Sequence, residues 1–326
     1  MKNIKITLVM TATAAMLAAC GGGGGSDTPA VVTPAPDTPA VVTPAVTADT
    51  LNRTNTPGVY ADNERKYMFD SLNQVRGITG VGFLKQNEAL DKAAQTHAEY
   101  LWMNPGESGH TEKIDYVGFT GETPADRARH FGYAGYASES VVGSITAMGA
   151  INGLLGGPYH ARHLLWDDND LGTGRVSSGA HTVVTGTNSW NDRQKLAGDQ
   201  IAMYPCNNIQ VNVQGQGYET PTPAVLNGKD DFGYSSMAIV RRGQTLVVDA
   251  WELRDAAGNL VPTVVMTGAN DTLKYFSNHE AALIPLNALP RTVTTYTSVL
   301  KGKNNGVPFE KTCTWRTVAG ETVPSN

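Results

Sequence analysis

Positive charge is scarce in this sequence. Lys and Arg number 25 against 30 Asp and Glu, which gives the 326-residue chain a formal net charge of −5. The densest basic spots are Arg127 with Arg129 and the pair Arg241-Arg242. A nucleic-acid-binding protein carries a basic face or run, so we do not expect nucleic acid as a partner. The charged share, 17%, is also too low for a chain kept disordered by its charge, and the length suits about two domains.

Apolar runs long enough to cross a bilayer, which takes about 20 residues, are missing as well. The N-terminal run Ile6–Ala19 is shorter, follows two lysines and leads into Leu-Ala-Ala-Cys, which ends at Cys20. A basic start, a short apolar stretch and small residues are typical of a secretory signal. We therefore predict that residues 1–20 are a signal peptide and that the protein is exported.

Cys20 gives this signal a second feature. Small residues directly before a cysteine resemble the lipobox of bacterial lipoproteins, in which the cysteine becomes the lipidated N-terminus. Two or more acyl chains make a stable anchor, so we expect the protein to be attached to the membrane of the cell envelope. Because Gly21 rather than Asp follows, the expected location is the outer membrane. The alternative is an ordinary signal with a chance cysteine.

Residues 21–50 are predicted to be a linker. Five glycines come first, and the sequence DTPAVVTPA then occurs twice, at Asp27–Ala35 and Asp37–Ala45. Proline fixes the backbone and removes a hydrogen-bond donor, so such a tract favours an extended, semi-rigid spacer. It cannot build a core, and the folded part is expected within residues 51–326.

Cysteine is rare, with three residues in all. If Cys20 carries lipid, Cys206 and Cys313 remain as an even pair in an oxidising compartment. We predict a disulfide between them, which would contribute up to about 4–5 kcal/mol by restricting the unfolded chain. The alternative is two separate buried thiols.

The apolar pattern divides the folded part in two. Residues 61–165 are mostly helical in pattern, including an apolar stretch rich in small residues at 140–155, and strand-like runs follow to about residue 204. Beyond residue 208 short alternating runs predominate, among them two that read as a hairpin around Arg242-Gly243. We therefore predict an α/β domain at residues 51–205 and a small Ig-like β-sandwich at residues 206–326.

The first half carries several motifs in a fixed order. They are Asn73-x-x-Arg76-x-x-x-Gly80, Leu84-x-x-Asn87-x-x-Leu90-x-x-Ala93-Ala94-x-x-His97-Ala98, Ser108-Gly109-His110-Thr111, Arg127 with Phe131-Gly132-Tyr133, Ser138-Glu139-Ser140-Val141-Val142, Pro158-Tyr159-His160-Ala161-Arg162-His163-Leu164-Leu165 and Asp170-Leu171-Gly172-Thr173-Gly174. Together they resemble the CAP superfamily, also called SCP-like, of cysteine-rich secretory proteins, antigen 5 and plant pathogenesis-related proteins. This resemblance implies an α-β-α sandwich.

The resemblance also implies a cleft lined by two histidines and two acids. By motif the histidines are His110 and His160, and one acid is Glu139. The second acid normally lies between the motif that contains Glu139 and the motif that begins at Pro158, but residues 144–157 contain neither Asp nor Glu. This leaves a triad, with Glu107 and Glu112 as the acids near enough in sequence to replace the missing one.

Two functions are open for this cleft. Some relatives bind lipids or sterols, which implies a non-enzymatic role in binding a hydrophobic ligand, an envelope component or a protein partner. The alternative is a hydrolase: His110, His160 and Glu139 would match the ligand count of an open zinc site, where a divalent metal activates water. A third interpretation of the same residues has no catalytic role. The His and Glu side chains would form hydrogen bonds with one another in a polar cleft that binds metal weakly or not at all.

Other polar residues of this half are given structural or weaker roles. Ser108 and Ser138 are neighbours of cleft residues, but the sequence lacks Gly-x-Ser-x-Gly, the signal of a serine nucleophile. His97 lies on an apolar helix face and is expected to be a core histidine, and His163 is expected to be structural. Arg127 is predicted to pair with Glu139 beneath the cleft.

Overall fold

The computed structural model describes residues 46–144, 146–177, 179–212, 219–229, 231–290 and 292–318. These residues belong to one compact unit that starts at Ala45. The predicted signal peptide, Cys20 and most of the predicted linker lie outside the described residues. None of the described helices combines the length and apolar character needed to cross a membrane.

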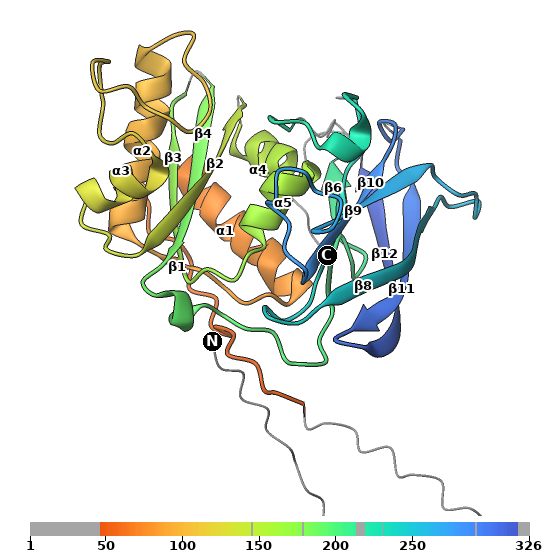
Figure 1. Cartoon of the computed structure of the whole chain (residues 1–326). Helices are drawn as coiled ribbons and strands as arrows, with labels where there is room; N and C mark the ends of the chain where they lie inside the picture. The colour runs from red at the N-terminus through yellow and green to blue at the C-terminus, as the bar shows by residue number, and fades with distance from the viewer. Residues whose placement is uncertain are drawn as a thin grey trace, which may run out of the picture. The chain divides into compact units, whose positions relative to one another are not determined.

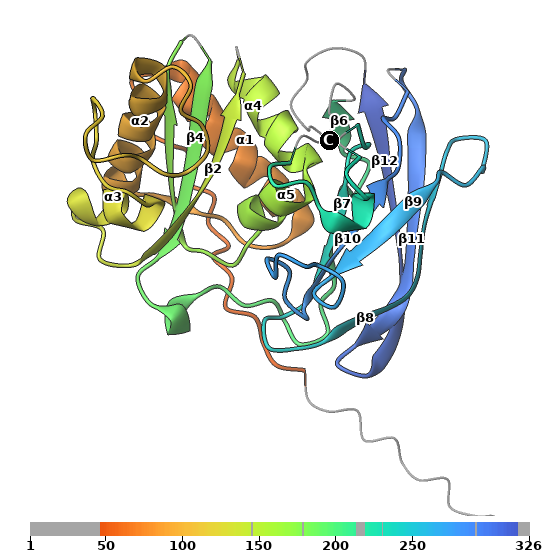
Figure 2. The same cartoon turned by 45° about the horizontal axis from the view of Figure 1, so that its top comes forward.

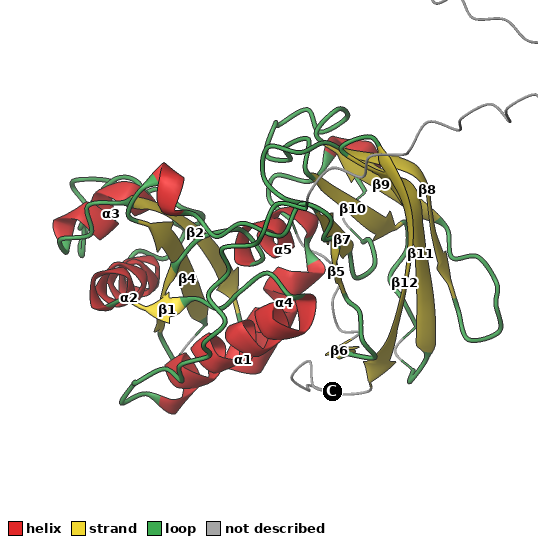
Figure 3. Cartoon of the chain, turned by 90° about the horizontal axis from the view of Figure 1, so that it is seen from below, coloured by secondary structure: helices red, strands yellow, loops and turns green. Residues whose placement is uncertain are grey.

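The first half is a three-layer sandwich. Its central sheet has the strand order β1-β3-β4-β2, with β2 at one edge. Helices α2 and α3 pack on one face of this sheet, and α1, α4 and α5 pack on the other (Figure 3). The predicted α-β-α architecture is thereby confirmed. The element bounds are α1 Asn63–Thr79, β1 Lys85–Gln86, α2 Glu88–Met103, α3 Pro124–His130, β2 Tyr136–Gly143, α4 Ala147–Gly156, α5 Pro158–Leu164, β3 Asp170–Arg175 and β4 Ala180–Thr187.

The helices begin where the sequence supplies caps. The Asp62 side chain accepts from the first-turn amides of α1, Asn87 does the same for α2, and Thr123 forms a capping box with Asp126 at α3. Two glycines of β3 then let α2 lie directly on the sheet. A Cβ on Gly172 would meet the Leu90 carbonyl carbon at 2.1 Å, so only glycine permits this approach.

The small-residue stretch 140–155 differs from the helical expectation. Its first residues belong to β2, which pairs with β4 without interruption over eight residues, and only the later ones form α4. The β-branched Val141 and Val142 suit a strand, and Thr146 caps α4 through its side chain. The switch places Glu139 and Ser140 on opposite faces of the sheet.

The second half is a β-sandwich of two four-stranded sheets, as predicted (Figures 1 and 2). One sheet has the order β5-β7-β10-β9 and the other β6-β12-β11-β8. Between the two sheets the rings of Tyr296 and Trp315 stack, with their centroids 4.7 Å apart. The element bounds are β5 Ala202–Tyr204, β6 Gln210–Asn212, β7 Ser236–Ile239, β8 Leu246–Arg254, β9 Thr263–Thr267, β10 Glu280–Pro285, β11 Thr295–Asn304 and β12 Val307–Val318, with short 3-10 helices at Trp190–Asp192 and Ala224–Leu226.

The hairpin predicted around Arg242-Gly243 is wrong. Strands β7 and β8 flank this turn but lie in different sheets, so the turn carries the chain from one sheet to the other. All four residues of β7 are buried, because it sits between β5 and β10. Apolar runs on both sides of a tight turn do not distinguish a hairpin from such a crossing.

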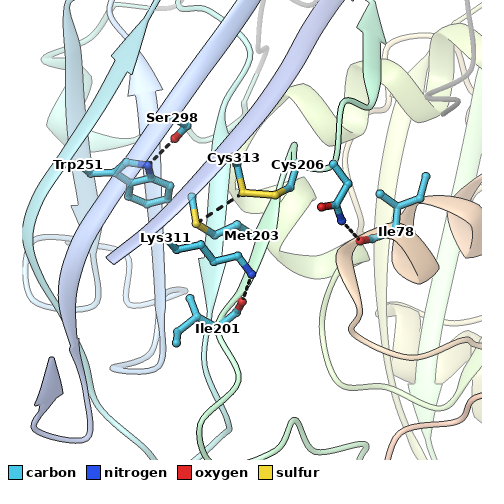
Figure 4. Close-up of a disulfide and its surroundings, with 9 residues drawn as sticks. Ile78, Ile201, Met203, Cys206, Trp251, Ser298, Lys311 and Cys313 are labelled. Atoms are coloured by element: carbon cyan, nitrogen blue, oxygen red, sulfur yellow. Dashed lines mark hydrogen bonds between the residues drawn. A yellow bond between two sulfur atoms is a disulfide. The ribbon is translucent and has the colours of Figure 1, made fainter. Parts of the chain in front are cut away.

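The disulfide between Cys206 and Cys313 is confirmed. The sulfur atoms are 2.10 Å apart and the Cα atoms 4.7 Å apart. Cys206 follows β5 and Cys313 lies in β12, so the bond ties one sheet of the sandwich to the other, beside Met203 (Figure 4). It is therefore a cross-link within the sandwich. Strand β5, which precedes Cys206, is already part of that sandwich.

Candidate functional site

Glu139 of β2 is the centre of a buried ion pair with Arg127 of α3. Arg127 Nη2 donates to Glu139 Oε1 at 2.9 Å and to Oε2 at 2.8 Å, and both side chains are inaccessible to solvent. The predicted pairing of these two residues is confirmed. Arg127 Nη1 also donates to the carbonyl oxygen of His110 at 3.0 Å, so the same guanidinium fixes the backbone that carries the cleft histidine.

His110 lies directly above this pair. Its Nδ1 is 3.0 Å from Glu139 Oε1, and 43% of its side chain is exposed. A carboxylate can only accept here, so Nδ1 carries the proton and Nε2 is left for a ligand. No described residue forms a hydrogen bond with that Nε2. Burial tends to raise the pKa of Glu139, but the His110 hydrogen bond and the charges of His97 and Arg127 outweigh burial and hold that pKa below its usual value.

A second buried pair supports this arrangement from below. His97 of α2 contacts Glu112 Oε1 through Nδ1 and the Gly109 carbonyl through Nε2, each at 2.9 Å, and it is fully buried. His97 is therefore a satisfied core histidine, as predicted. Glu112 forms hydrogen bonds with His97 and with the Thr120 amide. Glu107 forms an ion pair with Lys113. Neither glutamate contacts His110 or His160.

His160 of α5 has a carboxylate partner of its own. Its Nδ1 is 2.9 Å from Glu219 Oε1, and its backbone amide donates to the same oxygen at 3.1 Å. The His160 side chain is 17% exposed and the Glu219 side chain 1% exposed. In the described part of the chain no hydrogen bond or ion pair joins His160 to Glu139. The three residues of the predicted triad thus divide into a His110–Glu139 pair and a His160–Glu219 pair.

Glu219 escapes prediction because it lies 59 residues from His160, in the second half of the chain. The sequence carries one weak signal of an acceptor from outside the helix, and the structure adds an observation at the same glycine. Helix α5 begins without a side-chain cap of its own, since Gly157 occupies the cap position. A Cβ at Gly157 would lie 1.9 Å from Glu219 Oε1, so the glycine makes room for this carboxylate.

His163 of α5 is buried against strands β2 and β4. Burial, followed by the charges of His160 and His110, lowers its pKa to about 3, so the ring is neutral. Ser140 Oγ is 2.6 Å from its Nδ1 and Thr185 Oγ1 is 2.9 Å from its Nε2. Because Thr185 donates its proton to Asp168, Nε2 of His163 donates to Thr185 and Ser140 donates to Nδ1. His163 therefore has a structural role, as predicted.

The predicted metal ligands His110, Glu139 and His160 do not form one metal-binding cluster among the described residues. Nδ1 of His110 and of His160 each bonds a carboxylate, which leaves Nε2 of each ring for a ligand, but Arg127 occupies both oxygens of Glu139. No group of three or more His, Cys, Asp or Glu side chains in the described ranges is arranged to hold a metal ion. We therefore derive no step through a metal.

Comparison with known proteins identifies the first half. Residues 69–187 match the profile of CAP, the cysteine-rich secretory protein family. No curated protein matches the chain. A solved structure, the 1.5 Angstrom crystal structure of an extracellular protein containing a SCP domain from Bacillus anthracis str. Ames, is 18% identical with a TM-score of 0.35. That similarity covers 40% of this chain and 45% of the other, so the chain spans less than half of that protein's length. Residues 69–187, which contain His110, Glu139 and His160, are a CAP domain.

Proposed function

We propose that this chain is an exported, lipid-anchored protein of the cell envelope whose CAP domain binds a polar envelope ligand through His110 and His160. The family's description as secretory proteins supports export. The Cys206–Cys313 disulfide supports it as well, because such bonds persist in oxidising compartments. The signal-like sequence before Cys20 supports the anchor.

One observation carries the binding role: each cleft histidine is held at Nδ1 by a buried carboxylate, with Nε2 unbonded in the described structure. A neutral ring held in this way accepts a hydrogen bond at Nε2, and a protonated ring donates one. Ligands with hydroxyl, amide or carboxylate groups suit such atoms. Peptidoglycan carries all three, and it is the envelope component we propose.

The hydrophobic ligand that the family resemblance implied has less support at this site. The groove of about 610 Å³ near α2 is lined by other residues, among them Tyr60, Asp91 and Phe131, and by neither cleft histidine. A fluorescent fatty acid that bound equally well to the wild type and to the His110→Ala variant would place an apolar ligand elsewhere on the protein.

The binding test uses purified peptidoglycan sacculi. We expect wild-type protein to cosediment with sacculi and His110→Ala and His160→Ala to bind about tenfold more weakly, since one lost polar contact of about 1.4 kcal/mol corresponds to that factor. His130→Ala is the matched control, because His130 is an exposed histidine on α3. Equal sedimentation of all four proteins would contradict the proposal.

The anchor has its own test. Cys20→Ser removes the sulfur that would carry lipid, so the variant is expected in the soluble fraction after cell lysis, whereas wild type sediments with membranes. Ser26→Ala, a substitution close to Cys20 that keeps all three cysteines, serves as the control. Membrane sedimentation of the Cys20→Ser variant would exclude the lipid anchor.

A hydrolase is the second candidate, and the His110–Glu139 pair favours it specifically. A buried carboxylate that orients an imidazole through Nδ1 leaves Nε2 as a general base for water. Among the described residues no hydrogen bond joins Ser108 or Ser138 to the ring of His110, so a serine nucleophile has no support. Soluble fragments released from sacculi by wild type but not by His110→Ala would establish turnover. Binding without release would leave the binding role alone.

A further inference from the structure

We infer that Glu219, which the C-terminal half contributes, is the positioning residue for His160, so that the β-sandwich completes the cleft of the CAP domain. The inference deepens the proposed function, since it rests on His160 being a ligand-binding residue. Its structural content, the orientation of one imidazole by one carboxylate, can be measured without any ligand.

Two donors of His160 converge on one oxygen of Glu219. The backbone amide fixes the carboxylate relative to α5, and the ring Nδ1 then meets the same Oε1 atom at 2.9 Å. Because the acceptor is fixed by the backbone bond, it also fixes the rotation of the ring. With Nδ1 engaged, the part of the ring left for solvent carries Nε2.

The pocket around this carboxylate is tightly built. Glu219 is almost fully buried at the start of α5, where Gly157 leaves space for its oxygen, since any Cβ there would overlap it at 1.9 Å. Burying a carboxylate is costly unless it is hydrogen-bonded. The two donors of His160 supply those bonds, so the carboxylate and the histidine depend on each other.

Two further carboxylates of the C-terminal half hold α5 on either side of His160. The Tyr159 hydroxyl donates to Asp271 Oδ1 at 2.7 Å, and Arg162 Nε donates to Glu280 Oε2 at 2.9 Å. Three acids of the second half thus hold this one helix, but only Glu219 reaches the ring of a cleft histidine. Glu280 therefore offers a control at the same helix and with similar burial.

A purely structural role for Glu219 would be that of a helix cap. The backbone bond alone would then matter, and the His160 ring would keep its state when the carboxylate is removed. The proton position on the ring separates the two roles, because it depends on the acceptor at Nδ1 and is insensitive to general loss of stability.

The test is long-range ¹H–¹⁵N NMR of the full chain labelled with ¹⁵N-histidine, at a pH where His160 is neutral. We expect the proton on Nδ1 in wild type and in Glu219→Gln, whose amide oxygen still accepts. In Glu219→Ala we expect it to move to Nε2, the form a free imidazole prefers. Glu280→Ala should leave the His160 signals unchanged.

Several outcomes would overturn the inference. A wild-type His160 with its proton on Nε2 would do so at once, even if the alanine variant does not fold. Retention of the Nδ1 proton in Glu219→Ala, or an equal change in Glu280→Ala, would also do so. Loss of sacculus binding is a separate readout, so failure of the proposed ligand leaves the NMR result intact.

Discussion

Glu139 serves two neighbours at once, because its carboxylate balances the charge of buried Arg127 and orients exposed His110. A residue with only the first task would be a structural ion pair. The second task links that pair to the surface, so a change at Glu139 is expected to alter both the stability of the fold and the state of the cleft.

Replacing Glu139 by Gln should lower the free energy of unfolding by about 3 kcal/mol, because buried Arg127 loses its bidentate partner and keeps only Glu112, 3.6 Å from its Nε. Urea denaturation measures this loss. In the control Glu107→Gln, which breaks the exposed pair with Lys113, we expect about 0–1 kcal/mol. Equal, small effects in both variants would show that Arg127 finds another partner.

The buried His163 predicts a pH dependence. Burial lowers its pKa to about 3 in the folded state from an ordinary value of 6.5, so the unfolded chain binds more protons between these two values. The free energy of unfolding therefore falls as pH decreases from 6.5 toward 3. The buried Asp168, whose pKa burial raises, acts in the opposite direction.

A comparison of variants isolates the imidazole. Urea midpoints at pH 7.0, 5.5 and 4.5 should fall more steeply for wild type than for His163→Leu, which cannot take up a proton there. Parallel midpoints for the two proteins would show that His163 does not titrate in this range.

At the scale of elements, α5 depends on contacts from outside its own sequence neighbourhood. It is a seven-residue helix without a side-chain cap, and short helices are marginal without tertiary support. Its N-terminus receives Glu219 in the place where a local Ser, Thr or Asp would ordinarily bind. The helix position is therefore sensitive to the space at Gly157.

Gly157→Ala is expected to destabilise the protein by about 1–3 kcal/mol, because the new methyl group would overlap Glu219 Oε1 and force it away. Thermal unfolding measures the change. Gly153→Ala in neighbouring α4 is the control: its Cβ would meet only Val142 at 3.7 Å, and alanine within a helix is neutral or stabilising by up to about 1 kcal/mol. A tolerated alanine at 157 would contradict the tight packing at Glu219.

The elements that the sequence predicts well are those with local signals. Helix α2 follows from the apolar spacing of Leu90, His97 and Leu101, and α3 follows from Thr123 at the cap position with Pro124 after it. The division of 140–155 into β2 and α4 does not follow, because small apolar residues suit either structure. In the site, the Arg127–Glu139 pair agrees with a hypothesis based only on their opposite charges, whereas Glu219 was not predicted, because its contact with His160 joins residues far apart in the sequence.

On the scale of the whole molecule, the two halves share one apolar core. Buried residues of α1 and α5, such as Leu72 and Leu164, belong to the same cluster as Met237 and Leu283 of the sandwich. Cys206–Cys313 lies within that cluster and ties together the two sheets of the sandwich. A change that destabilises the sandwich is therefore expected to destabilise the helices that share its apolar core.

The disulfide should contribute up to about 4–5 kcal/mol, since it closes a long loop in the unfolded chain. The double variant Cys206→Ala with Cys313→Ala is expected to unfold at clearly lower urea concentration than wild type. Reduced wild type is the control, and it should unfold close to the double variant. An unchanged midpoint would show that the cross-link does not restrict the unfolded state.

Three carboxylates of the C-terminal half accept hydrogen bonds from α5, and this has a consequence for the evolution of the protein. If recombination joined the CAP segment to a different C-terminal domain, Tyr159, His160 and Arg162 would lose their carboxylate partners. A substitution at position 219, which is 59 residues from His160 in the chain, would be inherited as an altered orientation of the His160 ring. The two halves are therefore expected to vary together as a single heritable unit.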